Sequence, residues 1–120
     1  TIYLANLTKQ QAVIGIIQKI VDDSKSFKII INKTNIFLND EFTGNDTIFL
    51  NIKKNRNLFL LQKKIAENLK DLVNKKKDKK KILNQKLRES LLKYGFPFVG
   101  SHWKPHFTIG SIKDFKTKDH

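Results

Sequence analysis

The sequence predicts a single α+β domain with a mostly antiparallel sheet. Apolar patterns follow one another in the order strand, helix, strands, helix, helix, strand, and turn-forming residues separate several of them. A chain of 120 residues is long enough to bury one modest core. Residues 1–120 are therefore expected to form one domain.

The chain opens with a predicted strand and a predicted helix. Thr1–Asn6 is β-branched and apolar, which favours a strand, and Thr8 is a candidate N-cap for the helix that follows. Apolar residues at helical spacing give that helix one apolar stripe: Ala12, Val13, Ile16, Ile17, Ile20 and Val21.

A β-hairpin is predicted next. Phe27–Ile31 reads as a buried strand, and Ile36–Leu38 reads as its continuation or as a second short strand. Asn39–Asp46 has the composition of a turn, and Thr47–Ile52 is again a strand. The span from Ile36 to Ile52 is therefore predicted to be a hairpin.

Two further helices and a last strand complete the predicted fold. The second helix carries an apolar stripe made of Leu58, Leu61, Ile65, Leu69 and Leu72. Lys75–Lys81 holds six lysines in seven residues and is expected to be solvated. The third helix follows through Leu83, Leu87, Leu91 and Tyr94, and Gly95 ends it. His106–Ile112 then predicts a strand.

The charge balance suggests an acidic partner. Twenty-four Lys and Arg against eleven Asp and Glu leave a net charge of +13, which attracts polyanions such as RNA. A biased genome composition or a membrane-facing surface would explain the same excess. The membrane reading is the weaker one, because acidic residues are mixed with lysine on the polar faces of the predicted helices.

Cysteine is absent, and this limits the possible chemistry. Disulfides, thiolate catalysis and cysteine-ligated zinc are excluded, and the composition suits a reducing cytosol. No apolar run reaches the roughly 18–20 residues that a membrane span needs. We therefore expect a cytoplasmic protein.

One short pattern in the last strand could carry chemistry. Residues i and i+2 of a strand share a face, so His106 and Thr108 are expected to point the same way while Phe107 points to the other side. An imidazole can act as acid or base, and a threonine hydroxyl can donate to a phosphate oxygen. Gly110 is expected to continue this face without a side chain. A lone His-x-Thr pattern also arises by chance.

The surrounding residues give the pattern its meaning. Lys104–Gly110, with the sequence KPHFTIG, resembles the second signature of the two-histidine (2H) phosphoesterase superfamily, which includes 2′-5′ RNA ligase-like proteins and cyclic phosphodiesterases. The resemblance implies a fold of two pseudo-symmetric lobes, with antiparallel sheets and flanking helices. It also implies two His-x-Thr or His-x-Ser motifs facing one another across a cleft, with His106 and Thr108 as one of them.

The first motif of the family is incomplete in this sequence. The only His-x-Thr or His-x-Ser pattern is the one at His106, but Thr1 could be the threonine of the first motif. We then expect the chain to lack its first strand and first catalytic histidine, and to be inactive by itself. The alternative is a true start at Thr1, in a degenerate and inactive relative.

The resemblance implies metal-independent phosphodiester chemistry without a cofactor. One histidine would activate the attacking oxygen, the other would protonate the leaving oxygen, and the two threonines would hold the phosphate. The substrate would be an RNA end or a cyclic nucleotide, and the reaction either hydrolysis or ligation. No membrane and no obligatory protein partner are expected, and the protein is expected to be a monomer.

Four residues are candidate substrate contacts, each with a plainer alternative. Lys104 could contact a phosphate or be an ordinary surface lysine, and Trp103 could stack on a base or cover the sheet edge. His102 is expected in a loop, where it could touch substrate or face solvent. Tyr3 would share the face of Thr1 if both lie in a strand.

Two functions from different classes remain open. The first is a 2H-type phosphoesterase or ligase, that is, an enzyme. The second is a non-catalytic basic RNA-binding module of the same fold.

Overall fold

The computed structural model describes residues 1–40, 44–74 and 84–113, and its secondary structure is α+β, as the sequence predicts. The chain forms two compact units. The sheet unit comprises Thr1, Lys28–Asn55 and the chain from Pro105 onward. The helical unit comprises Ile2–Phe27 and Arg56–Lys104.

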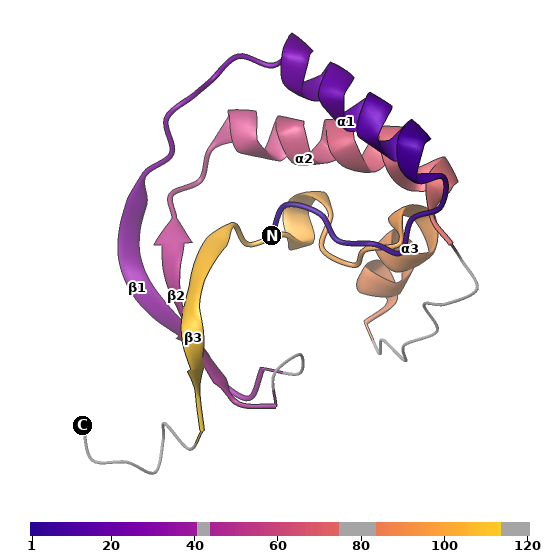
Figure 1. The fold of residues 1–120 in the computed structure, drawn as a ribbon. Coiled ribbons are helices and arrows are strands. Elements are labelled where there is room, and N and C mark those ends of the chain that lie inside the picture. The colour runs from indigo at the N-terminus through magenta and orange to yellow at the C-terminus, as the bar shows by residue number, and fades with distance from the viewer. Residues whose placement is uncertain (41–43, 75–83, 114–120) are drawn as a thin grey trace. The chain divides into compact units, whose positions relative to one another are not determined.

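In the sheet unit, the described residues form three antiparallel strands in the order β1-β2-β3 (Figure 1). Their bounds are Ile31–Phe37 for β1, Asp46–Ile52 for β2 and His106–Ile112 for β3. β3 has the bounds that the sequence predicts. β1 and β2 form the predicted hairpin, and β3 returns from far along the chain to pair with the free edge of β2.

β1 begins later than the sequence predicts. Ile31 pairs with Ile52, which is the last residue of β2. Residues 27–30 therefore lie beyond the ladder, where the Ile30 carbonyl accepts a hydrogen bond from the Lys53 N–H at 2.7 Å. The prediction of a strand over Phe27–Ile31 is wrong in all but its last residue, because the extent of the partner strand sets the start of pairing.

Hydrogen bonds to the side chains of two aspartates stabilise the turn between β1 and β2. Asn39 has a left-handed φ of 52°, and its N–H donates to Asp46 Oδ1 at 2.9 Å. The Thr47 hydroxyl donates to Asp40 Oδ2 at 2.7 Å. These local hydrogen bonds agree with the turn predicted at Asn39–Asp46, whose residues 41–43 lie outside the described part of the chain.

The described residues of the helical unit form three α-helices and two short 3₁₀ turns. Their bounds are Gln10–Asp23 for α1, Arg56–Leu69 for α2, Lys70–Leu72 for η1, Gln85–Tyr94 for α3 and Gly100–His102 for η2. All three predicted helices are thus present. α1 and α2 lie side by side and run in opposite directions (Figure 1).

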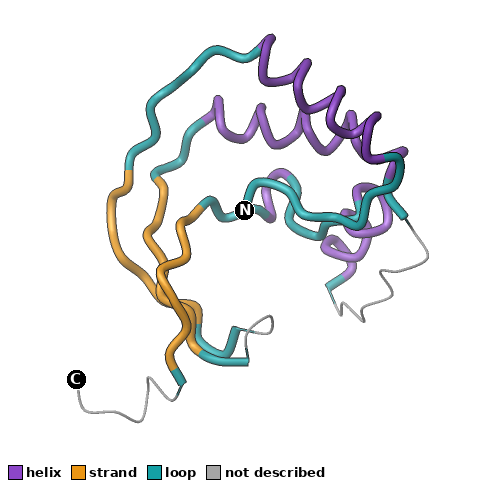
Figure 2. The backbone as a smooth tube through the Cα atoms, viewed as in Figure 1, coloured by secondary structure: helices purple, strands orange, loops and turns teal. Residues whose placement is uncertain are grey.

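The segment before α1 is extended but is not the predicted strand (Figure 2). One isolated antiparallel bridge joins Leu7 to Val73. Thr8 is not the N-cap, because Lys9 holds that position with a left-handed φ of 54° and the Thr8 hydroxyl donates to the Leu72 carbonyl at 3.0 Å. Apolar composition alone therefore does not make Thr1–Asn6 a strand.

The buried side chain of Gln62 forms hydrogen bonds to two irregular segments of the helical unit. Its side chain has no exposed surface, and both polar ends are used. The amide Nε2 donates to the Ile2 carbonyl at 3.0 Å and to the Phe98 carbonyl at 2.7 Å, and Oε1 accepts from the Gly100 N–H at 2.9 Å. A helix side chain thus fixes two irregular segments. The apolar core beside it consists of Ala66, Tyr94, Phe96 and Val99.

Both ends of α3 have the residues that helix ends require. The Asn84 side chain accepts from the N–H groups of Lys86 at 2.9 Å and Leu87 at 3.3 Å. Gly95 ends the helix with a φ of 70°, as predicted. A Cβ at this glycine would lie 2.5 Å from Val73 Cγ1, so both backbone conformation and space demand glycine here.

Glu67 should make stability depend on pH in the acid range. The Tyr94 hydroxyl donates to it at 2.6 Å and Lys70 lies at 2.9 Å, and these partners lower the pKa of Glu67 from 4.5 to about 2. Between these two values the unfolded chain binds more protons at this residue, so the free energy of unfolding should fall as the pH falls through that window. Glu67→Gln should flatten this dependence.

Urea denaturation at a series of pH values, followed by Trp103 fluorescence, measures the effect. Trp103 is the only tryptophan, and it lies in the helical unit with 7% of its surface exposed. Glu89→Gln is the matched control, since Glu89 is exposed on α3. Equal pH slopes for wild type and Glu67→Gln would contradict the prediction.

Within the residues that the structure describes, every helix is too short or too polar to cross a lipid bilayer. The lysine-rich run Lys75–Lys81 lies outside the described residues, and so does Leu83 of the predicted third helix.

Candidate active site

The register of β3 places His106 and Thr108 on one face of the sheet. His106 pairs with Asn51 and Thr108 pairs with Phe49 on β2. Asn51 and Phe49 are two residues apart, so their side chains share a face with those of His106 and Thr108. Phe107 pairs with Leu50 and points to the opposite face. We call the first of these the His106 face.

Two phenylalanines from the other strands hold the His106 ring. The ring centroids of Phe37 on β1 and Phe49 on β2 each lie 5.2 Å from the imidazole, in edge-to-face geometry. Phe37 and Phe49 stack on each other at 4.0 Å. Phe49 has no exposed surface, while His106 is half-buried. The imidazole is therefore oriented by packing and still has a solvent-facing part.

The face beyond Thr108 differs from the sequence expectation. Gly110 pairs with Ile48, one residue before Phe49, so Ile109 is an extra residue in β3. This bulge turns Gly110 to the opposite face and brings Ser111, which pairs with Thr47, onto the His106 face. The expectation that Gly110 continues the face of His106 and Thr108 is wrong, because Ser111 is the next residue on that face.

Asn51 and Ser111 are polar residues of the His106 face that sequence reasoning missed. Asn51 lies directly opposite His106, and its Nδ2 donates to Asn32 Oδ1 at 2.7 Å. Asn51 shares the face of the imidazole, and its amide oxygen, which accepts hydrogen bonds, could hold the attacking water. No sequence signal could have found it, since its relation to His106 depends on the strand register.

Thr108 is the exposed member of the predicted pair. Its hydroxyl lies on the same face as the His106 imidazole, and solvent reaches its side chain. A hydroxyl and an imidazole side by side can bind a phosphate oxygen and exchange a proton. The sequence predicts the same chemistry for these two residues.

Thr1 and Tyr3 do not share a strand face. Thr1 is exposed and belongs to the sheet unit, whereas Tyr3 belongs to the helical unit. The Tyr3 hydroxyl donates to the Tyr94 carbonyl, and burial raises the pKa of Tyr3 to about 12. Its ring packs edge-on against Phe96 at 5.8 Å. Tyr3 is therefore a packing residue, and the alternation on which its predicted site role depended is absent.

The residues before Pro105 also differ in exposure from one another. Trp103 is 7% exposed and packs edge-on against Phe59 of α2 at 5.2 Å, so it covers a helix rather than the expected sheet edge and leaves little surface for a base. His102 is half-buried at the end of η2, and Lys104 is exposed. His120 lies outside the described residues.

No group of three His, Asp or Glu side chains that could hold a metal ion occurs among residues 1–40, 44–74 and 84–113. The chain matches no protein-family model, no curated protein and no solved structure.

Proposed function

We propose that this chain carries one half of the active site of a 2H-type phosphoesterase that acts on RNA ends or 2′,3′-cyclic phosphates. The observation that supports it is the His106 face, where a packed imidazole and an exposed threonine hydroxyl lie on one side of β3. The proposal includes two pseudo-symmetric lobes, each with one histidine motif, and a cytoplasmic location.

The proposed reaction opens a cyclic phosphate by hydrolysis. A water oxygen forms a new bond to phosphorus, and the bond from phosphorus to the ribose 2′ or 3′ oxygen breaks. One histidine takes the proton from the water, and the other gives a proton to the leaving ribose oxygen. Thr108 donates a hydrogen bond to a non-bridging phosphate oxygen, and Ser111 or Asn51 can add a second polar contact.

The proposed mechanism uses two histidines, but the sequence contains no second His-x-Thr or His-x-Ser pattern. His102 is followed at i+2 by Lys104, and His120 is the last residue of the sequence. The sequence pattern therefore assigns one histidine of the proposed pair, His106, and the test addresses the role of this residue.

The test is ring opening of a short RNA that ends in a 2′,3′-cyclic phosphate, in the presence of EDTA. We expect turnover by the wild type and a loss of at least about 100-fold in His106→Ala, because a positioned acid or base contributes about 10²–10⁴-fold. Phe107→Ala is the matched control, since Phe107 follows His106 on β3 and points to the opposite face of the sheet. That variant should keep most of the activity.

A non-catalytic RNA-binding module is the second candidate, and the net charge of +13 favours it. It would be supported if the full-length protein bound RNA tightly but turned over neither the cyclic end, nor 2′-5′-linked RNA, nor small cyclic phosphates. Equal activity of wild type and His106→Ala would also contradict the proposed site.

A further inference from the structure

The helical unit has an open pocket between the C-terminal end of α1 and the first half of α2. Its volume is about 410 Å³, and its lining comes from residues 24–27 after α1 and from four residues of α2. The α2 residues are Asn57, Leu60, Leu61 and Lys64, which are spaced at i, i+3, i+4 and i+7. That spacing places them on one helix face, so the pocket has a continuous helical wall.

The lining combines an apolar floor with a positively charged rim. Leu60 is 55% exposed, and Phe27 is half-buried. Phe27 makes no ring contact with another aromatic residue of the described chain. The pocket thus offers an aromatic ring and an aliphatic surface that a flat apolar group could cover.

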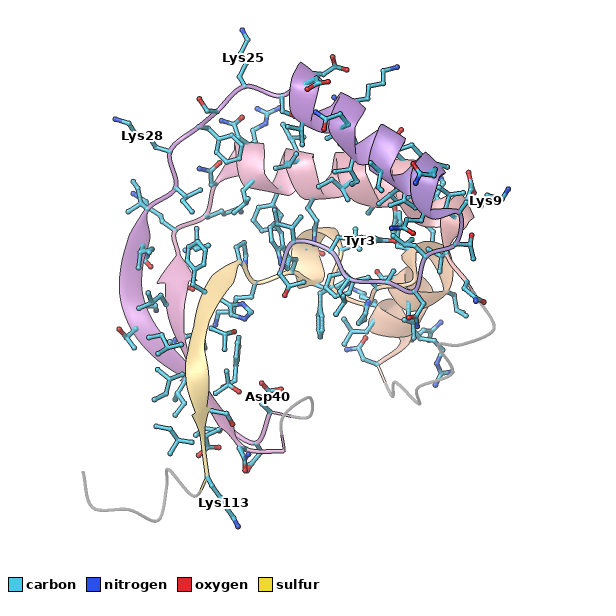
Figure 3. The ribbon with its side chains drawn as sticks, in the orientation of Figure 1. Tyr3, Lys9, Lys25, Lys28, Asp40 and Lys113 are labelled. Carbon is cyan, nitrogen blue, oxygen red and sulfur yellow. The ribbon has the colours of Figure 1, made fainter. Side chains whose placement is uncertain are left out.

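Lys25 and Lys64 supply the charge. Figure 3 shows Lys25 extending away from the ribbon just beyond the end of α1. Neither lysine forms an ion pair with a carboxylate of the described residues. Asp22 and Asp23 precede the pocket along the chain but do not line it, and the Gln18 amide donates to Asp22 at 2.8 Å.

The neighbouring residues of the helical unit add to this positive charge. Residues 24–27 and 56–66 together contain four basic residues and no acidic residue. A pocket that joins an aromatic and aliphatic floor to a cationic rim matches a nucleotide, whose base is flat and whose phosphate is anionic. A helix of a partner protein would cover the floor, but it would also need acidic side chains opposite both lysines.

We propose that this pocket binds one nucleotide of a single-stranded RNA, with the base against Phe27 and the backbone phosphates near Lys25 and Lys64. Naming single-stranded RNA as the substrate class rests on the proposed phosphoesterase function. The binding itself does not depend on catalysis.

The first test removes the two lysines and measures RNA affinity against salt. Lys25→Gln/Lys64→Gln is compared with Lys19→Gln/Lys63→Gln, which removes two exposed lysines from the same helical unit outside the pocket. The probe is a labelled oligoadenylate of about 12 nucleotides. Two lost phosphate contacts should reduce the slope of log affinity against log salt by about 1.4, and the control should keep the wild-type slope.

The second test separates base contact from charge. Phe27→Leu should lower oligoadenylate affinity about tenfold and leave the affinity for inorganic polyphosphate unchanged, because polyphosphate has no base to stack. The double lysine variant should weaken both ligands. The fluorescence of Trp103 and the far-ultraviolet circular dichroism check that each variant is folded.

Equal salt slopes for the two double variants would overturn the phosphate contact, and an equal loss of both ligands in Phe27→Leu would overturn the base contact. Failure here is distinct from failure of the proposed activity. Hydrolysis of a 2′,3′-cyclic mononucleotide requires the His106 site but not this pocket, whereas oligoadenylate binding requires no turnover.

Discussion

Replacement of Gln62 with leucine should lower the free energy of unfolding of the helical unit by about 4 kcal/mol. The substitution keeps the helix propensity of α2 and adds apolar volume, but it removes the hydrogen bonds of Gln62 to three backbone groups. The carbonyls of Ile2 and Phe98 and the N–H of Gly100 would lose their hydrogen bonds to a side chain with no exposed surface. Each buried group left without a partner costs about 1–3 kcal/mol.

The measurement is urea denaturation followed by the fluorescence of Trp103. Gln11→Leu is the matched control, because Gln11 is an exposed residue of α1 and the same chemical change there should cost less than about 0.5 kcal/mol. A Gln62→Leu variant as stable as Gln11→Leu would mean that water or local rearrangement satisfies the three groups.

Gln62 also marks the limit of what the sequence could predict about the fold. Four residues of the predicted apolar stripe lie in α2, because helix periodicity is a local property, whereas Leu72 lies in η1 and only Leu58 and Leu69 of the stripe are buried. Gln62 lies at i+4 from Leu58 and at i−3 from Ile65, so helical spacing places it on the face of that stripe, but nothing in the sequence indicates its backbone partners. Its three partners lie 60, 36 and 38 residues away, so only the folded chain shows that it is buried.

The geometry of the candidate site was predictable where it depends only on alternation along a regular strand. Strand alternation correctly paired the faces of His106 and Thr108, since both residues lie in the regular part of β3. It failed at Gly110 because of the bulge at Ile109, which depends on the register with β2. It failed at Tyr3 because alternation applies only where a segment pairs with a neighbouring strand, and the segment before α1 makes a single bridge.

Phe49→Ala should destabilise the sheet unit by about 4 kcal/mol, because a fully buried phenylalanine loses its burial and leaves a cavity. The cavity would open between Phe37 and His106, which both contact this ring. Hydrogen exchange of the β2 and β3 amides measures the loss, since the sheet unit contains no tryptophan. Phe107→Ala is the control: Phe107 is 48% exposed on the opposite face, so it should cost less than about 1.5 kcal/mol.

Phe49→Leu separates stability from the orientation of His106. Leucine fills much of the same space, so the loss of stability should stay near 1.5 kcal/mol, but it has no ring to meet the imidazole edge-on. If the phenylalanines orient the catalytic histidine, turnover of the cyclic phosphate should fall more in Phe49→Leu than in an equally destabilised variant such as Ile52→Val. Ile52 is also buried on β2, but its side chain points to the opposite face. Equal turnover in the two variants would mean that the aromatic contacts contribute packing but do not orient His106 for the reaction.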